Sequence, residues 1–220
     1  MVDILIKGGP VMIPLLLCSV LALAISFERI YYLLRNSSDP DSAVEAVTLA
    51  LEDGRLSDTV GRLAKVRGPL SALATVGLSY YGKSRGDLER ALEFAGEQEI
   101  HKMERYVPWL GMIVSIAPLL GILGTITGLM KCYGVIAKNP VLLEVGALSA
   151  GIAEALITTA AGLIIAVPSL FLYTYITGII DRRTAEMNAF CQKLLDVFSA
   201  SVREVASSEF QAKGKQAATH

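Results

Sequence analysis

The sequence predicts an all-α, polytopic membrane protein with three transmembrane helices and long helices that extend into the cytoplasm. Of its 220 residues, 53% are hydrophobic and 19% are charged, a balance that is rare in soluble domains. Residues 8–27, 106–130 and 155–180 carry no charged side chain. Each stretch reaches the roughly 20 residues that a helix needs to cross a bilayer core. Apolar residues nowhere keep a two-residue alternation for long, so no β-sheet is expected.

We expect the chain to divide into six consecutive parts. These are the N-terminus with the first transmembrane helix (1–32), a cytoplasmic helical loop (33–105), the second transmembrane helix (106–131), a short periplasmic loop (132–150), the third transmembrane helix (151–181), and a cytoplasmic helix with a polar tail (182–220). Lys and Arg number 11 in residues 28–105 and 6 from residue 181 onward, and they are sparse elsewhere. The positive-inside rule therefore predicts a periplasmic N-terminus and a cytoplasmic C-terminus.

The first hydrophobic stretch is expected to remain in the lipid bilayer as an anchor. Residues 22–24, Ala-Leu-Ala, imitate a signal-peptidase site. However, the preceding segment carries only Lys7, which Asp3 offsets, whereas a signal peptide begins with a positively charged region.

Capping signals predict several helices in the cytoplasmic loop. They are a helix from Asp39 and Pro40 to Gly54, a helical segment Leu56–Lys65, a helix opened by Pro69, and a helix capped by Asp87. The last has no helix breaker before Pro108, so we expect it to continue into the second span. After Glu204 the residues are small and polar, which is typical of a disordered tail.

Residues 77–84, GLSYYGKS, match the P-loop pattern letter for letter. A P-loop follows a buried strand and opens a helix, so that its backbone amides cradle phosphates. The preceding PLSALATV is typical of a helix instead, and Gly86 interrupts the helix that should follow. We therefore favour a helix that ends near Gly82, followed by a basic turn, and keep a P-loop ATPase subunit as a rival hypothesis.

The sequence predicts no metal site, no cofactor and no enzyme activity. Cys18, Cys132 and Cys191 fall in three different parts of the expected topology, which separates them too far for a shared metal or a disulfide. His101 lies among acidic residues, which favours a solvated surface histidine. No serine or cysteine has a base in its sequence context, and a net charge of −1 gives no basic field for nucleic acid.

The third span opens with one acid, Glu154, and two adjacent hydroxyls, Thr158 and Thr159. A lone acid within a membrane helix is costly and is typical of a proton relay. Counting back from Asp181 places Glu154 near the outer boundary of the membrane, whereas a longer helix would place it deeper. We expect no base from the membrane segments of this chain to accompany it, so a partner or another copy would supply one.

Both later spans carry a narrow face of small residues. On a helical wheel, the face of the third span comprises Ala155, Thr159, Gly162, Ala166, Ser169, Tyr173 and Thr177. Thr158 lies about 100° away from Thr159. The second span has a ridge of Ala117, Gly121, Gly124 and Gly128, with Thr125 beside it. Small faces permit close packing of membrane helices, and the sequence leaves open whether these two faces pack together or several copies line a pore.

The motifs of these two spans resemble those of a known family. APLLGILGTITGLM (117–130) and GIAEALITTAAGLIIAVPSLFLY (151–173) strongly resemble the MotA/TolQ/ExbB proton-channel family. Three spans with the large loop after the first look like its ExbB/TolQ branch, with ExbB-like favoured, because MotA-type stators carry four spans.

The resemblance implies a homopentamer in the bacterial inner membrane around a dimer of a single-span ExbD- or TolR-like protein. In that family the proton motive force energises a TonB- or TolA-like protein that reaches across the envelope. By motif, the resemblance assigns Glu154, Thr159 and Thr125 to the proton pathway, with Thr158 as the weaker candidate. The residues expected to pack helices are Gly121, Gly124, Gly128 and Gly162. The transported ion is H⁺, with Na⁺ as the alternative, and a structural membrane scaffold is the remaining rival.

Overall fold

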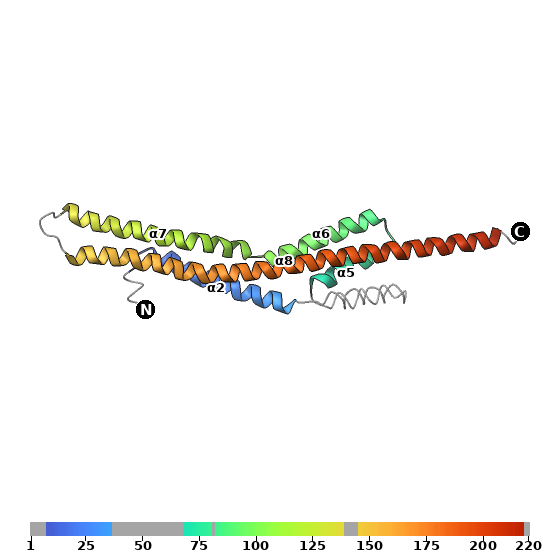
Figure 1. Cartoon of the computed structure of the whole chain (residues 1–220), viewed down its shortest axis with the longest axis horizontal. Helices are drawn as coiled ribbons and strands as arrows, with labels where there is room; N and C mark the ends of the chain where they lie inside the picture. The colour runs from blue at the N-terminus through green and yellow to red at the C-terminus, as the bar shows by residue number, and fades with distance from the viewer. Residues whose placement is uncertain (1–7, 37–67, 81, 139–144, 218–220) are drawn as a thin grey trace. The chain divides into compact units, whose positions relative to one another are not determined.

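A computed structural model describes residues 8–36, 68–80, 82–138 and 145–217, and all regular structure in these ranges is helical. The helices are α2 (Met12–Arg35), α5 (Pro69–Ser79), α6 (Arg85–Glu104), α7 (Val107–Lys138) and α8 (Val145–Ala217) (Figure 1). Three segments are long and apolar enough to cross a membrane: Met12–Arg35, Val107–Gly134 and Ser149–Ser199. The predicted fold class, an all-α polytopic membrane protein, is confirmed. The helices expected at 39–54 and 56–65 lie outside the described residues.

The chain divides into two compact units. The spanning unit comprises Met1–Tyr31 and Glu104–Gly178, and the second unit comprises Tyr32–Met103 and Ile179–His220. The membrane-spanning parts of α2, α7 and α8 belong to the first, whereas α5, α6 and the later part of α8 belong to the second.

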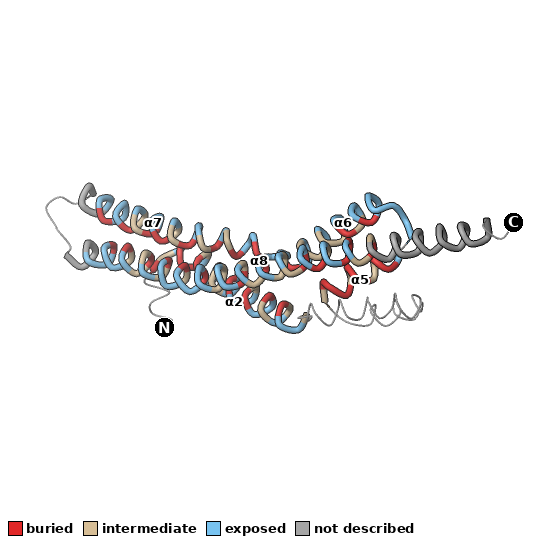
Figure 2. The backbone as a smooth tube through the Cα atoms, turned by 45° about the vertical axis from the view of Figure 1, so that its right-hand side comes forward, coloured by how far each residue is buried: buried red, intermediate tan, exposed pale blue. Residues whose placement is uncertain are grey.

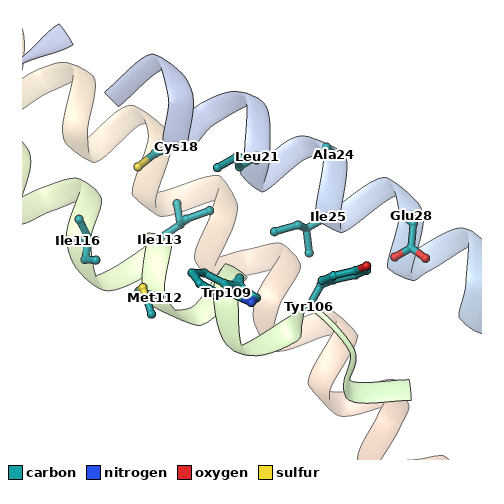
Figure 3. A pocket seen from close by; sticks show the side chains of 10 residues that line it. All are labelled: Cys18, Leu21, Ala24, Ile25, Glu28, Tyr106, Trp109, Met112, Ile113 and Ile116. Atoms are coloured by element: carbon teal, nitrogen blue, oxygen red, sulfur yellow. The ribbon is translucent and has the colours of Figure 1, made fainter. Parts of the chain in front are cut away.

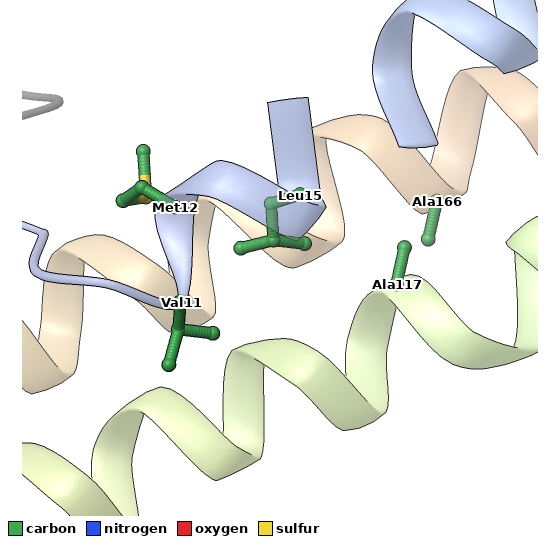
Figure 4. Packing of buried hydrophobic residues seen from close by; sticks show 5 residues of the cluster. All are labelled: Val11, Met12, Leu15, Ala117 and Ala166. Atoms are coloured by element: carbon green, nitrogen blue, oxygen red, sulfur yellow. The ribbon is translucent and has the colours of Figure 1, made fainter. Parts of the chain in front are cut away.

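Within the spanning unit, the start of α2 packs against α7 and α8. Val11, Met12 and Leu15 form a buried cluster with Ala117 of α7 and Ala166 of α8 (Figure 4). Buried and exposed positions alternate along these helices (Figure 2). Bulky residues of α8 that do not belong to its small face are exposed, namely Leu156, Leu163, Val167, Leu170 and Phe171. A large exposed apolar surface of this kind is typical of contact with lipid or with other helices.

The second unit has an apolar core shared by α5, α6 and the later part of α8. Its fully buried side chains include Leu73, Leu92, Phe190 and Leu194. A Cβ on Gly77 would lie 3.3 Å from the Phe198 ring, so α5 packs closely on α8. Within this unit, Arg183 also donates a hydrogen bond of 2.7 Å to the carbonyl of Asn36, just beyond α2.

The predicted continuous helix from Asp87 into the second span is wrong. α6 ends at Glu104 and α7 begins at Val107, and between them Tyr106 has a φ of 68°. Pro108 lacks a backbone N–H, and its ring would clash with the carbonyl of Glu104 in a continuous helix. Proline is tolerated in the first turn of a helix, so the chain breaks at Tyr106 and starts a new helix that contains it.

Ser84, rather than Asp87, caps the N-terminus of α6. The Asp87 backbone N–H donates to Ser84 Oγ at 3.2 Å, and the Ser84 hydroxyl donates to Asp87 Oδ2 at 2.7 Å. The first of these bonds is that of an N-cap serine, whose oxygen accepts from a backbone N–H in the first turn of the helix. Pro69 opens α5 as predicted.

The P-loop hypothesis is contradicted by the fold around its motif. Residues 69–79, where a P-loop requires a buried strand, form helix α5. The first three residues of the motif therefore belong to a helix, and their backbone N–H groups are not arranged to cradle a phosphate.

α8 is longer than the sequence predicts. It continues to Ala217, so most of the segment expected to be a disordered tail is helical. Ala, Glu, Gln and Lys after residue 204 are good helix formers, and this local preference outweighs the polar composition.

Candidate functional site

The small faces of α7 and α8 pack against each other within one chain. A Cβ on Gly162 would lie 2.7 Å from the Ala117 carbonyl oxygen, and one on Gly121 would lie 3.1 Å from the Thr159 Cα. A Cβ on Gly128 would lie 2.7 Å from the carbonyl oxygen of Gly151. The two backbones thus touch directly, which larger residues would prevent. We call this contact the α7–α8 seam.

Thr158 lies in the middle of the seam. Its side chain is fully buried, and a Cβ on Gly124 would collide with it. The hydroxyl donates to carbonyl oxygens of its own helix, Glu154 at 3.0 Å and Ala155 at 2.9 Å. The wheel separated Thr158 from the small face. Residues three and four positions apart lie on the same side of a helix. Thr158 follows Ala155 by three positions and precedes Gly162 by four, so it belongs to the seam.

Thr159 and Thr125 lie beside the seam and are partly exposed. The Thr159 hydroxyl is within hydrogen-bonding distance of two carbonyl oxygens, Gly121 across the seam at 3.2 Å and Ala155 at 3.3 Å. The Thr125 hydroxyl donates to the carbonyl of Ile122 at 2.6 Å. Because Gly121 precedes Thr125 by one helical turn, both threonines belong to the same stretch of the helix pair.

Glu154 forms an ion pair with Lys131 near the connected ends of α7 and α8. Lys131 Nζ lies 2.5 Å from Oε1 and 2.8 Å from Oε2 of the glutamate. The glutamate side chain is 12% exposed and the lysine side chain 53%. The expectation that no base from the membrane segments would accompany Glu154 is therefore wrong.

A signal for this pair was present in the sequence. Consecutive helices joined by a short connection run antiparallel, so residues at similar distances from the connection lie side by side. Lys131 and Glu154 lie seven and nine residues from the facing ends of α7 and α8. Their charges are opposite, and the spacing brings them together.

A glycine turn before α2 covers the other side of Glu154. Gly9 has a φ of 68°, and a Cβ there would collide with the Glu154 carboxylate. The Gly9 carbonyl accepts a hydrogen bond of 3.2 Å from the Met12 N–H, which closes the turn. A Cβ on the neighbouring Gly8 would lie 3.4 Å from Ile157 of α8. Because Gly9 has no side chain, the backbone of the turn can lie close to the carboxylate.

A groove of about 790 Å³ lies between α2 and α7 within the spanning unit (Figure 3). Its lining residues are Cys18, Leu21, Ala24, Ile25, Glu28, Tyr106, Trp109, Met112, Ile113 and Ile116. Buried Arg29 pairs with Glu28 and lies 5.6 Å from the centre of the Tyr106 ring. Apolar side-chain atoms line most of the groove. It therefore suits a lipid acyl chain or another helix better than a catalysed reaction.

The described residues contain no group of three or more His, Cys, Asp or Glu side chains that could hold a metal ion. Cys18, Cys132 and Cys191 form no disulfide, and His101 is exposed on α6.

Comparison with known proteins assigns the chain to a family. A model of the MotA/TolQ/ExbB proton channel family matches residues 65–189, more than half of the sequence. The chain belongs to the MotA/TolQ/ExbB proton channel family. The match includes all of α5, α6 and α7 and the first part of α8, with both Lys131 and Glu154. The family is one of channels rather than enzymes.

Individual relatives indicate the ExbB-like branch of the MotA/TolQ/ExbB family. Biopolymer transport protein ExbB-like 1 of Synechocystis sp. is 32% identical over 182 residues, 81% of this chain and 71% of the relative. ExbB-like 3 of the same organism is 27% identical over 201 residues, 86% of this chain and 94% of the relative. The Tol-Pal system protein TolQ of Haemophilus influenzae is 40% identical over 86 residues, 38% of this chain and 36% of the relative.

Proposed function

We propose that this chain is the proton-channel subunit of a motor in the bacterial inner membrane. Five copies surround a dimer of a single-span ExbD- or TolR-like protein. Proton flow down the proton motive force drives this assembly to energise a TonB- or TolA-like partner that spans the envelope. The N-terminus is periplasmic and the C-terminus cytoplasmic.

The observation that carries the proposal is the placement of Glu154. Among the described residues between Val107 and Ile180, Glu154 is the only acidic side chain. It lies at one edge of the seam. An ionisable group at such a position is a functional site by default, since its desolvation has to be offset. Each proton that falls through 100 mV releases about 2.3 kcal/mol, enough to bias a rearrangement between states of similar energy.

Burial separates the roles of the three threonines. Thr125 and Thr159 remain partly exposed beside the seam, where water or a partner helix can reach their hydroxyls. Thr158 is fully buried and its hydroxyl is bonded within its own helix. The proposed proton path therefore uses Glu154, Thr159 and Thr125, whereas Thr158 serves mainly to pack the helices.

A structural scaffold is the second candidate, because the seam explains the small residues by packing within one chain. Gly121, Gly124, Gly128 and Gly162 all make close contacts there. Close packing of small residues does not by itself call for Glu154, whose removal from water is costly even though its ion pair with Lys131 also joins α7 and α8.

Ion flux in liposomes tests the proposal. The purified chain is reconstituted with and without its single-span partner, and a pH-sensitive dye is followed while a membrane potential is imposed. We expect proton flux above that of protein-free liposomes when the partner is present, independent of Na⁺. Flux equal to that of protein-free liposomes would favour the scaffold, and flux that requires Na⁺ would identify a sodium-driven motor.

A further inference from the structure

The Lys131–Glu154 pair is asymmetric in its exposure to solvent. The glutamate side chain is 12% exposed, whereas the lysine side chain is 53% exposed. An exposed lysine loses little when its partner is removed, because water solvates it. A shielded carboxylate loses much more when its counter-charge is removed, because desolvation favours its neutral, protonated form. The pair therefore controls the charge of Glu154 far more than that of Lys131.

Among the described residues around Glu154, this control falls to one side chain. The turn that covers the carboxylate presents Gly9, which has no titratable group. One turn further along its own helix, the Thr158 hydroxyl is bonded to backbone carbonyls. Among the described residues packed against Glu154, Lys131 of α7 supplies the charge that faces it.

We propose that Lys131 is the internal counter-ion of Glu154, which holds the carboxylate ionised and turned toward α7 until the pair opens. With both carboxylate oxygens at the lysine, the site does not accept a proton readily. Displacement of Lys131, whose side chain is 53% exposed, frees the carboxylate for protonation. Lys131 is thus a positioning residue that gates Glu154. The gating role in transport rests on the proposed function, but the control of protonation does not.

Carbodiimide labelling measures the protonation of Glu154 directly. Dicyclohexylcarbodiimide reacts with protonated carboxyl groups in apolar surroundings, and mass spectrometry of the peptide around Glu154 quantifies the adduct. The full-length chain is labelled in membranes at pH 7.5. A shielded carboxyl group without an opposite charge beside it is more readily protonated. We therefore expect Lys131→Met and Lys131→Gln to label at least about tenfold faster than the unchanged chain.

Two further variants separate charge from structure. Lys131→Arg keeps the charge and should label as slowly as the unchanged chain. Gly9→Ala should label faster, because its Cβ displaces the carboxylate from the lysine and the backbone φ of 68° is unfavourable for alanine. The matched control is Lys102→Met, since Lys102 pairs with Glu99 on α6 at similar exposures of 57% and 13%. It should leave labelling of Glu154 unchanged.

Equal labelling of Lys131→Met, Lys131→Gln and the unchanged chain would overturn the proposal, as would labelling of Lys131→Arg at the rate of Lys131→Met. Both outcomes are independent of ion flux. If labelling responds as expected but liposomes show no proton flux, the proposed function fails while the counter-ion role stands.

Discussion

At the scale of single residues, the glycines of the seam determine how closely α7 and α8 approach. Gly162→Leu should disrupt the fold of the spanning unit, because even a Cβ at this position would lie 2.7 Å from a backbone oxygen of α7. Overpacking of this kind costs about 1–3 kcal/mol. We expect a lower melting temperature and loss of the oligomer in mild detergent.

Gly178→Leu is the matched control for that experiment. Gly178 lies on the same helix, and a Cβ there has no atom within 4 Å in the single chain. Leucine at this position should leave the melting temperature unchanged. Equal tolerance of Gly162→Leu and Gly178→Leu would contradict the assigned packing role of Gly162.

The sequence predicts the chemistry of individual residues better than their partners. Glu154 stands out because an acid within a membrane helix has a high cost that needs a reason. Its pairing with Lys131 depends on the register between two helices, and Gly9 reaches it from a third segment of the chain. Hydrophobic pattern fixes neither of these long-range relations, and only the similar distances of Lys131 and Glu154 from the facing helix ends indicate the first of them. The full burial of Thr158 likewise depends on where α7 packs against α8, which a helical wheel of α8 alone does not show.

At the scale of elements, the break between α6 and α7 depends on an unusual backbone conformation of Tyr106. A residue other than glycine at a positive φ is uncommon, and for a β-branched residue it is strongly unfavourable. Tyr106→Val should therefore lower thermal stability, by about 1–2 kcal/mol relative to Tyr106→Asn, because asparagine tolerates this region.

The comparison of Tyr106→Val with Tyr106→Asn separates the effect of the backbone conformation from the effect of losing the tyrosine ring. Both variants lose the contacts of the ring with Arg29 and Arg105, whose guanidinium groups lie 5.6 and 4.8 Å from its centre. The two side chains are similar in size but differ in their tolerance of a φ of 68°. Equal melting temperatures for the two would indicate that the break does not depend on this conformation.

Element boundaries follow from the sequence where a strong local signal acts alone. Charge-free stretches predict the three spans, and Pro69 predicts the start of α5. At Pro108 two signals compete, because proline both interrupts a helix and is favoured in the first turn of one. Choosing between them requires the conformation of Tyr106, which composition does not reveal.

At the scale of the whole molecule, the distribution of Lys and Arg predicts the orientation in the membrane. Single cysteines are introduced at Lys138 and at Arg85 after replacement of the native cysteines, and a membrane-impermeant thiol reagent is added to intact cells. Lys138→Cys should be labelled from outside the inner membrane, whereas Arg85→Cys should react only after the membrane is opened. The reverse pattern would overturn the proposed topology.

Glu154 is proposed to take part in proton transfer rather than to serve packing. Glutamine keeps the size and hydrogen-bonding capacity of the side chain but cannot exchange the proton. Lys131 stays half in solvent, so loss of its partner costs little and Glu154→Gln should still assemble. Thr159→Val provides the graded comparison, since it removes only a hydroxyl with a carbonyl partner at 3.2 Å.

Proton flux through Glu154→Gln, measured in liposomes with the single-span partner, is the most direct test of this claim. We expect flux to be abolished in Glu154→Gln while the complex remains intact by size-exclusion chromatography. Flux should fall less in Thr159→Val and be partly retained in Glu154→Asp, which keeps the carboxylate but retracts it by one methylene. Full proton flux through an intact Glu154→Gln complex would contradict the account.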